Sequence, residues 1–214
     1  MAVPPFPHGF KTACEAIAVE ERAILGLRAW QPLHPLDLAA EHGVPVVPID
    51  ELAPHTRLAG TVAHLVHGPG AALLSGFTVC RGTRRLIGVN PSHTPGRQSS
   101  SVAHELAHLL LEHAPDQAVA EDGLLTRRAW TPQAEAEANW CAGVLLIPRP
   151  AALRFARNPH RREELQASYR VSEEMIDYRV NVTGAGPRRP GPPLTDLGPG
   201  RGATASGGRM ARDG

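Results

Sequence analysis

One short stretch of the chain has the residue types and spacing of a metal site: His104-Glu105-Leu106-Ala107-His108, an HExxH sequence. Residues four apart on an α-helix lie one above the other on the same face, so both imidazoles are able to reach one ion. Glu105 then faces the open side of that ion and is placed to take a proton from a water molecule. On a helix, and with a third ligand, this pattern predicts zinc-assisted hydrolysis.

The same residues also have a purely structural interpretation, in which His104 and Glu105 lie on a solvated helix surface and His108 is a hydrogen-bonded histidine at the core boundary. The third ligand decides between the two, because a catalytic zinc site has three protein ligands and a water. One extended pattern is excluded, since it requires glycine at position 111 and histidine at position 114. The chain has Leu111 and Ala114 there.

The remaining source of a third ligand is an acidic residue on a second helix, predicted over 132–146. Its first turns contain Glu135-Ala136-Glu137-Ala138-Asn139. Glu135 and Asn139 are four residues apart and share a face, whereas Glu137 points to the opposite side of the helix. A further histidine, His113, is one residue away from the position that the excluded pattern requires.

The elements that must position these residues are two helices. Apolar residues recur at helical spacing from Ser101 to His113, so we expect the HExxH sequence to lie on a helix. The second helix begins with Thr131 as its N-cap and Pro132 as its first residue, and Pro148 ends it.

The rest of the chain predicts an α+β fold, with a small antiparallel sheet and flanking helices. We expect helices over 10–27, from Pro35 to a stop at Gly43, over 161–169, and over 173–182 after Ser172 as N-cap. Apolar, β-branched stretches bounded by turns predict strands at 44–49, 61–67, 71–80 and 85–89.

Composition limits the function classes. The chain has 214 residues, 42% of them hydrophobic, a formal net charge of +1 and three widely spaced cysteines. We therefore expect a globular cytoplasmic protein without a disulfide framework, and no direct nucleic-acid partner. We also expect neither a membrane-spanning segment nor a secretory signal.

The composition changes near Gly184. From there to Gly214, nine glycines and five prolines accompany only two large aliphatic residues. Such a segment cannot bury enough apolar surface to offset the entropy of ordering. We predict a domain over residues 1–183 and a disordered Gly/Pro/Arg-rich tail over 184–214.

Two stretches of the sequence resemble the ImmA/IrrE metallopeptidases, also called the DUF955 domain. They are QSSSVAHELAHLLLEH (98–113) and EAEANWCAGVLLIP (135–148). Weaker similarity extends the match to about residues 10–184. Cys141 departs from the family pattern, which has an aromatic residue there; we expect its side chain to pack as a small apolar group rather than to act as a redox-sensitive thiol.

The resemblance implies a gluzincin-like zinc peptidase with one Zn²⁺ per chain, held by His104, His108 and Glu135, and with Glu105 as general base. Glu135 is preferred to Glu137 because related gluzincins place an Asp or Asn four residues after the ligand glutamate, as Asn139 is here.

The resemblance also implies the partner: a helix-turn-helix repressor, cut once to relieve transcription of stress, prophage or mobile-element genes. The alternative is a non-catalytic module that keeps the zinc fold and binds a repressor or antitoxin-like partner. A peptidase also needs a donor for the developing oxyanion. The candidates, which the sequence does not place, are Tyr169, Tyr178, Arg179, His93 and His113.

Overall fold

The computed structural model describes residues 6–52, 59–81, 83–113, 117–119, 125–127 and 130–185. The predicted tail therefore lies outside the described residues from residue 186 onward. The α-helices are α1 (Phe10–Ile24), α2 (Pro35–Glu41), α3 (Ile49–Leu52), α4 (Ala59–His67), α5 (Pro95–Leu110), α6 (Pro132–Leu146), α7 (Arg149–Arg157), α8 (Arg162–Tyr169) and α9 (Glu173–Val182). The 3-10 helices are η2 (Pro69–Leu73) and η3 (Pro159–Arg161), and the strands are β1 (Val46–Pro48), β2 (Gly76–Arg81), β3 (Arg84–Val89), β4 (Gln117–Val119) and β5 (Leu125–Arg127).

The fold is a helix-rich α+β arrangement, as the sequence predicts, but its sheet is mixed rather than antiparallel. The strand order is β1-β3-β2-β5-β4. β2 and β3 form an antiparallel hairpin, whereas β1 pairs with β3 in parallel, with Val46 opposite Ile87. The prediction of a purely antiparallel sheet is therefore wrong. Two parallel strands need a long crossover between them, and the sequence analysis interpreted part of that crossover as a strand.

That misassigned segment is residues 61–67, which form most of helix α4. Its β-branched residues indicated a strand, yet Val66 is buried and Val62 and Leu65 are half-buried, while their neighbours are exposed. Positions i, i+3 and i+4 share one face of a helix and not one face of a strand. Helix α4, together with α3 and η2, supplies the crossover from β1 toward the β2–β3 hairpin.

Two prolines begin helices and a third lies just before one, at positions where the sequence did not predict a helix start. Pro95 is the first residue of α5, which starts six residues earlier than expected, after Thr94 as N-cap. Pro148 ends α6, as predicted, and is also the N-cap of the unpredicted helix α7. Pro69 opens η2, so the predicted strand at 71–80 begins only at Gly76. Proline favours the first helical position because the amide there has no intrahelical partner.

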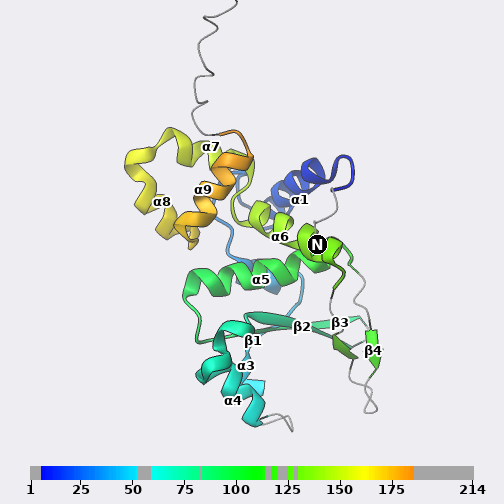
Figure 1. Ribbon diagram of the computed structural model, residues 1–214. Helices are drawn as coiled ribbons and strands as arrows, with labels where there is room; N and C mark the ends of the chain where they lie inside the picture. Colours follow the sequence, from blue (N-terminus) through cyan, green and yellow to red (C-terminus); the bar gives the residue numbers. More distant parts are fainter. Residues whose placement is uncertain are drawn as a thin grey trace, which may run out of the picture.

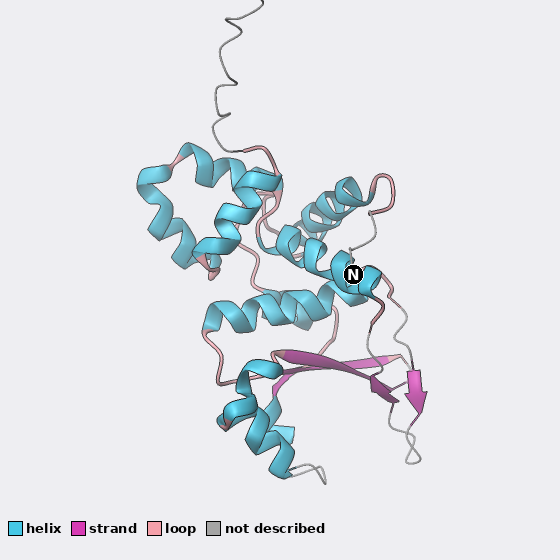
Figure 2. Ribbon diagram, in the orientation of Figure 1, coloured by secondary structure: helices cyan, strands magenta, loops and turns pink. Residues whose placement is uncertain are grey.

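Helix α5 lies along the sheet, with α6 on its other side (Figure 1). Figure 2 shows the strands on one side of α5 and most of the helices on the other. Gly88 in β3 permits close packing within the hairpin, because a Cβ there would lie 2.6 Å from the Phe77 ring. The core joins these layers and includes Ile87, Val102, Leu106, Ala138, Val144, Leu145, Cys14 and Ala18.

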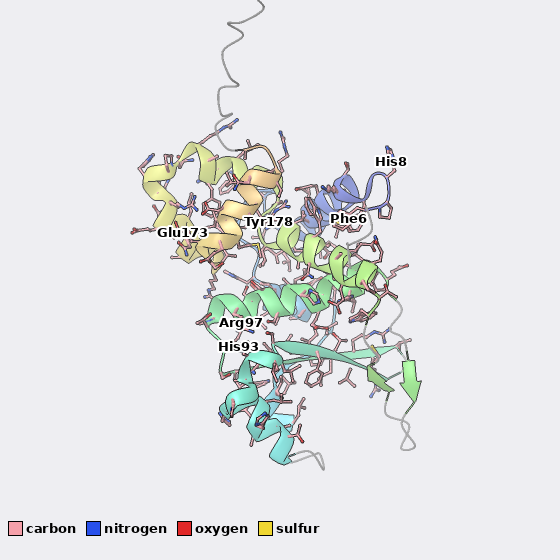
Figure 3. The ribbon with its side chains drawn as sticks, in the orientation of Figure 1. Phe6, His8, His93, Arg97, Glu173 and Tyr178 are labelled. Atoms are coloured by element: carbon pink, nitrogen blue, oxygen red, sulfur yellow. The ribbon has the colours of Figure 1, made fainter. Side chains whose placement is uncertain are left out.

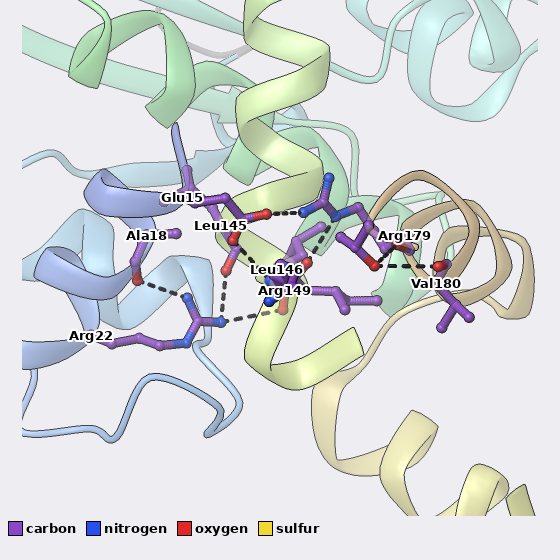
Figure 4. Close-up of polar contacts among 10 residues, drawn as sticks. Glu15, Ala18, Arg22, Leu145, Leu146, Arg149, Arg179 and Val180 are labelled. Carbon is purple, nitrogen blue, oxygen red and sulfur yellow. Dashed lines mark hydrogen bonds and ion pairs between the residues drawn. The ribbon is translucent and has the colours of Figure 1, made fainter. Parts of the chain in front are cut away.

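The C-terminal end of α6 is held by two buried arginines (Figure 4). Arg22 from α1 donates hydrogen bonds to the carbonyls of Leu145, at 2.8 Å, and Leu146, at 3.3 Å. Arg179 from α9 donates to the carbonyl of Ile147 at 2.8 Å. Burial lowers the pKa of Arg22 to about 10, so the guanidinium stays protonated at neutral pH. These contacts satisfy carbonyls that a helix end leaves without intrahelical partners.

Within the described ranges, no helix is long and apolar enough to cross a bilayer.

Candidate metal centre

Helix α5 presents both histidines of the HExxH sequence on one face. The hydroxyl of Thr94 accepts a hydrogen bond from the Arg97 amide at 3.4 Å, which caps the helix start. One helical turn separates His104 from His108, and their Nε2 atoms lie 3.1 Å apart. The two histidines are therefore arranged to bind the same ion, as the four-residue spacing predicts.

Helix α6 brings a carboxylate to the same point. Thr131 caps this helix by accepting a hydrogen bond from the Ala134 amide at 3.1 Å, and Pro132 is its first residue, both as predicted. The Glu135 carboxylate lies 3.3 Å from Nε2 of His104. One ligand atom from each of His104, His108 and Glu135 lies within 4.8 Å of the other two.

The donor set and its surroundings fit a bound metal ion. Two imidazole nitrogens and one carboxylate oxygen form the His₂Glu set that suits zinc in catalytic sites. The Nδ1 atom of His104 donates to Asn139 at 3.1 Å, and Nδ1 of His108 lies 2.9 Å from a ring nitrogen of His113. Because both Nδ1 atoms are engaged, both Nε2 atoms are directed at the shared point.

Glu105 lies beside the histidines but has a different environment. Its residue is only 4% exposed, and its carboxylate accepts a hydrogen bond from the Thr78 hydroxyl at 2.7 Å. Thr78 belongs to β2, so the sheet fixes the direction of this carboxylate. Sequence reasoning did not find Thr78, because no local pattern connects a strand residue to a helix 27 positions further on.

A cleft of about 450 Å³ opens over the site. It runs along α5 from the metal-site residues toward the helix N-terminus, where Arg97 is labelled in Figure 3. The described residues that line it are Leu73, Leu74, Ser75, Gly76, Arg97, Ser100, Ser101, His104, Glu105 and Asn139. The cleft therefore gives an extended ligand access to Glu105 and His104.

None of the five oxyanion candidates is among the described residues that line this cleft. Tyr169 is buried and donates to the carbonyl of Trp30, while Tyr178 packs against Trp140. The others have structural partners too: Arg179 contacts Ile147 and Glu15, His93 contacts Ala71, and His113 contacts His108 and Glu137.

Cys141 is fully buried in α6. A hydrogen bond with Cys14 and burial raise the pKa of its thiol. A thiol in this environment stays protonated and is a poor nucleophile, so Cys141 packs as a small apolar residue, as expected.

A second group of residues surrounds His108 through contacts that the sequence did not predict. Trp130 stacks on its imidazole, with ring centroids 4.1 Å apart and planes 10° from parallel. His113, whose Nδ1 contacts Nδ1 of His108, lies 3.1 Å from Glu137, which also accepts a hydrogen bond from Gln133. Glu137 thus faces His113, while Glu135 is the glutamate beside His104.

The fold and site together define a helix-rich α+β protein with a potential His/His/Glu metal centre. The family model described as the IrrE N-terminal-like domain, Peptidase_M78, matches residues 39–181. The chain therefore belongs to this family, and the membership supports a metallopeptidase. Comparisons with curated proteins and with solved structures give no match.

Proposed function

We propose that the protein is a gluzincin-like, zinc-dependent endopeptidase that makes a limited regulatory cut in a partner protein, a helix-turn-helix transcriptional repressor. The observation that carries this proposal is the convergence of His104, His108 and Glu135 within 4.8 Å beside the buried Glu105. These three residues would hold one zinc ion. A cytoplasmic location and the absence of a direct nucleic-acid partner remain predictions.

The chain's own residues account for the proton transfers. Zinc, when bound, is a Lewis acid that polarises a carbonyl and lowers the pKa of water. Glu105 takes the proton from the attacking water and later passes it to the leaving amine. The 2.7 Å hydrogen bond from Thr78 fixes the direction of the Glu105 carboxylate for this transfer.

The sheet offers a way to hold an extended substrate segment. In the described part of the chain, β5 pairs with β2 only at Cys80, at the far end of the strand from Gly76. Gly76 also lines the cleft next to Glu105. A peptide segment that pairs with this strand edge would gain main-chain hydrogen bonds and pass close to the general base.

The alternative function is a non-catalytic module that binds a repressor or antitoxin-like partner. Binding alone does not require a carboxylate beside the metal ligands. The placement of Glu105 at the cleft, oriented by Thr78, therefore favours the peptidase.

The experiment compares wild type with Glu105→Gln on a helix-turn-helix repressor encoded beside this gene, with fragments identified by mass spectrometry. Gln keeps the size of the side chain but removes the base, so we expect equal zinc content, one cut by wild type and none by the variant. Glu112→Gln, an exposed glutamate just after α5, is the matched control and should cut normally. Binding without cutting by wild type would favour the module, and full activity of Glu105→Gln would exclude Glu105 as the base.

A further inference from the structure

A chain of side chains connects His108 to an acidic residue on the neighbouring helix. Nδ1 of His108 lies 2.9 Å from Nδ1 of His113, and Nε2 of His113 lies 3.1 Å from the Glu137 carboxylate. The side chains of His113 and Glu137 are only 11% and 15% exposed. Gln133, one turn before Glu137, donates to its second oxygen. The contacts are therefore largely shielded from water.

The hydrogen-bond pattern has one consistent proton arrangement if His108 binds an ion through Nε2. Its Nδ1 then carries the proton and donates to Nδ1 of His113. The other nitrogen of His113 must therefore carry a proton, which it donates to the Glu137 carboxylate.

The backbone after α5 takes an uncommon conformation that places His113 between His108 and Glu137. Glu112 has φ of 53°, in the left-handed region. The Glu112 amide donates to Leu109 at 3.0 Å and the His113 amide donates to His108 at 3.0 Å. These two bonds form a Schellman motif, which usually has glycine at the left-handed position. The turn folds His113 back onto the helix end that carries His108.

The two histidines of the proposed zinc site therefore have different hydrogen-bond partners at Nδ1. His104 donates to a neutral amide, Asn139. Resting on the proposed function, we propose that His113 and Glu137 are positioning residues for the metal, which hold His108 in the tautomer with the proton on Nδ1 and strengthen Nε2 as a ligand. A carboxylate behind a ligating histidine raises the basicity of that ligand, and removing such a partner weakens metal affinity about 10- to 100-fold.

The test measures zinc affinity by competition with a chromophoric chelator for wild type, Glu137→Gln, His113→Phe and Glu112→Gln. We expect about 10- to 100-fold weaker binding for Glu137→Gln and His113→Phe. Glu112→Gln removes the same charge one residue from His113, but its side chain is exposed, so its affinity should equal that of wild type. NMR of ¹⁵N-labelled histidine in the metal-free proteins should show His108 with its proton on Nδ1 in wild type and a mixture of the two tautomers in Glu137→Gln.

The outcomes separate this inference from the proposed function. If wild type binds zinc and Glu137→Gln binds it equally well, the positioning role is wrong and the peptidase proposal stands. A lower melting temperature of metal-free Glu137→Gln with unchanged zinc affinity would likewise assign Glu137 a structural role only. If wild type binds no zinc, both proposals fail. If His113→Phe does not fold, the zinc affinity of Glu137→Gln alone tests the positioning role.

Discussion

The two ends of helix α6 have different roles in the structure. The first turns carry Glu135 and Asn139, whose side chains reach the metal-site histidines from a partly exposed position. The last turns, from Cys141 to Leu146, are buried, and two buried arginines contact the carbonyls at the end. One end of the helix therefore supplies chemical groups, and the other end fixes the helix in the core.

The charges at each end also suit the helix itself. The N-terminal end of an α-helix has a partial positive charge and the C-terminal end a partial negative one. Glu135 lies in the first turn, and Arg22 and Arg179 contact the last carbonyls. Since α6 is held from its far end, the site residues need not stabilise the fold. We expect substitutions at the site to affect chemistry, and substitutions at the arginine end to affect stability.

The largest expected effect on the fold comes from Arg22→Met. Arg22 is fully buried and donates to carbonyls from α1, α6 and Gln31, which the variant would leave without these partners. We expect the free energy of unfolding to fall by about 3 to 5 kcal/mol, measured by denaturant titration of the metal-free protein. The exposed Arg28→Met is the control. Equal denaturation midpoints for the two variants would contradict the anchoring role of Arg22.

A smaller effect is expected from Thr78→Val, which acts on the chemical end. It keeps the shape of the strand residue and removes the 2.7 Å hydrogen bond to Glu105. We expect kcat to fall about tenfold, which is about 1.4 kcal/mol, while zinc content stays at the wild-type level. Thr61→Val, the same change at an exposed position, should have no effect. If kcat is unchanged in Thr78→Val, the hydroxyl does not orient the base.

The smallest effect is expected at the turn after α5. Glycine takes the left-handed conformation without the cost of about 1 kcal/mol that other residues meet, so Glu112→Gly should leave thermal stability equal to wild type or slightly above it. Glu112→Val should lower the melting temperature, because a β-branched residue fits this conformation poorly. Equal losses in both variants would show that the side chain of Glu112, rather than its backbone, supports the turn.

The sequence located both site helices because their signals are local, although α5 begins six residues before the predicted start. The caps at Thr131 and Ser172 are confirmed, as each side chain accepts a hydrogen bond from the amide three residues later. Helix α4 was missed because β-branched residues favour a strand when the burial pattern is unknown. β1 was placed correctly, but its parallel pairing depends on that helical crossover.

The candidate site, too, could be predicted from the sequence only where its signals are local. The spacing of His104 and His108 follows from helical geometry, and Glu135 was selected by resemblance to a family pattern. The partners of Glu105 and His108 were not found, since Thr78 reaches the site through tertiary packing. His113 reaches it through a left-handed residue, Glu112, whose conformation a single non-glycine letter does not indicate.

The central claim is that Glu135 completes a zinc site with His104 and His108. Elemental analysis after gel filtration tests it most directly, with wild type, Glu135→Ala and Glu137→Ala loaded at saturating zinc. We expect about one zinc per chain for wild type, retention of most of it by Glu137→Ala, and loss of most of it by Glu135→Ala. Full zinc occupancy in Glu135→Ala together with loss in Glu137→Ala would contradict it.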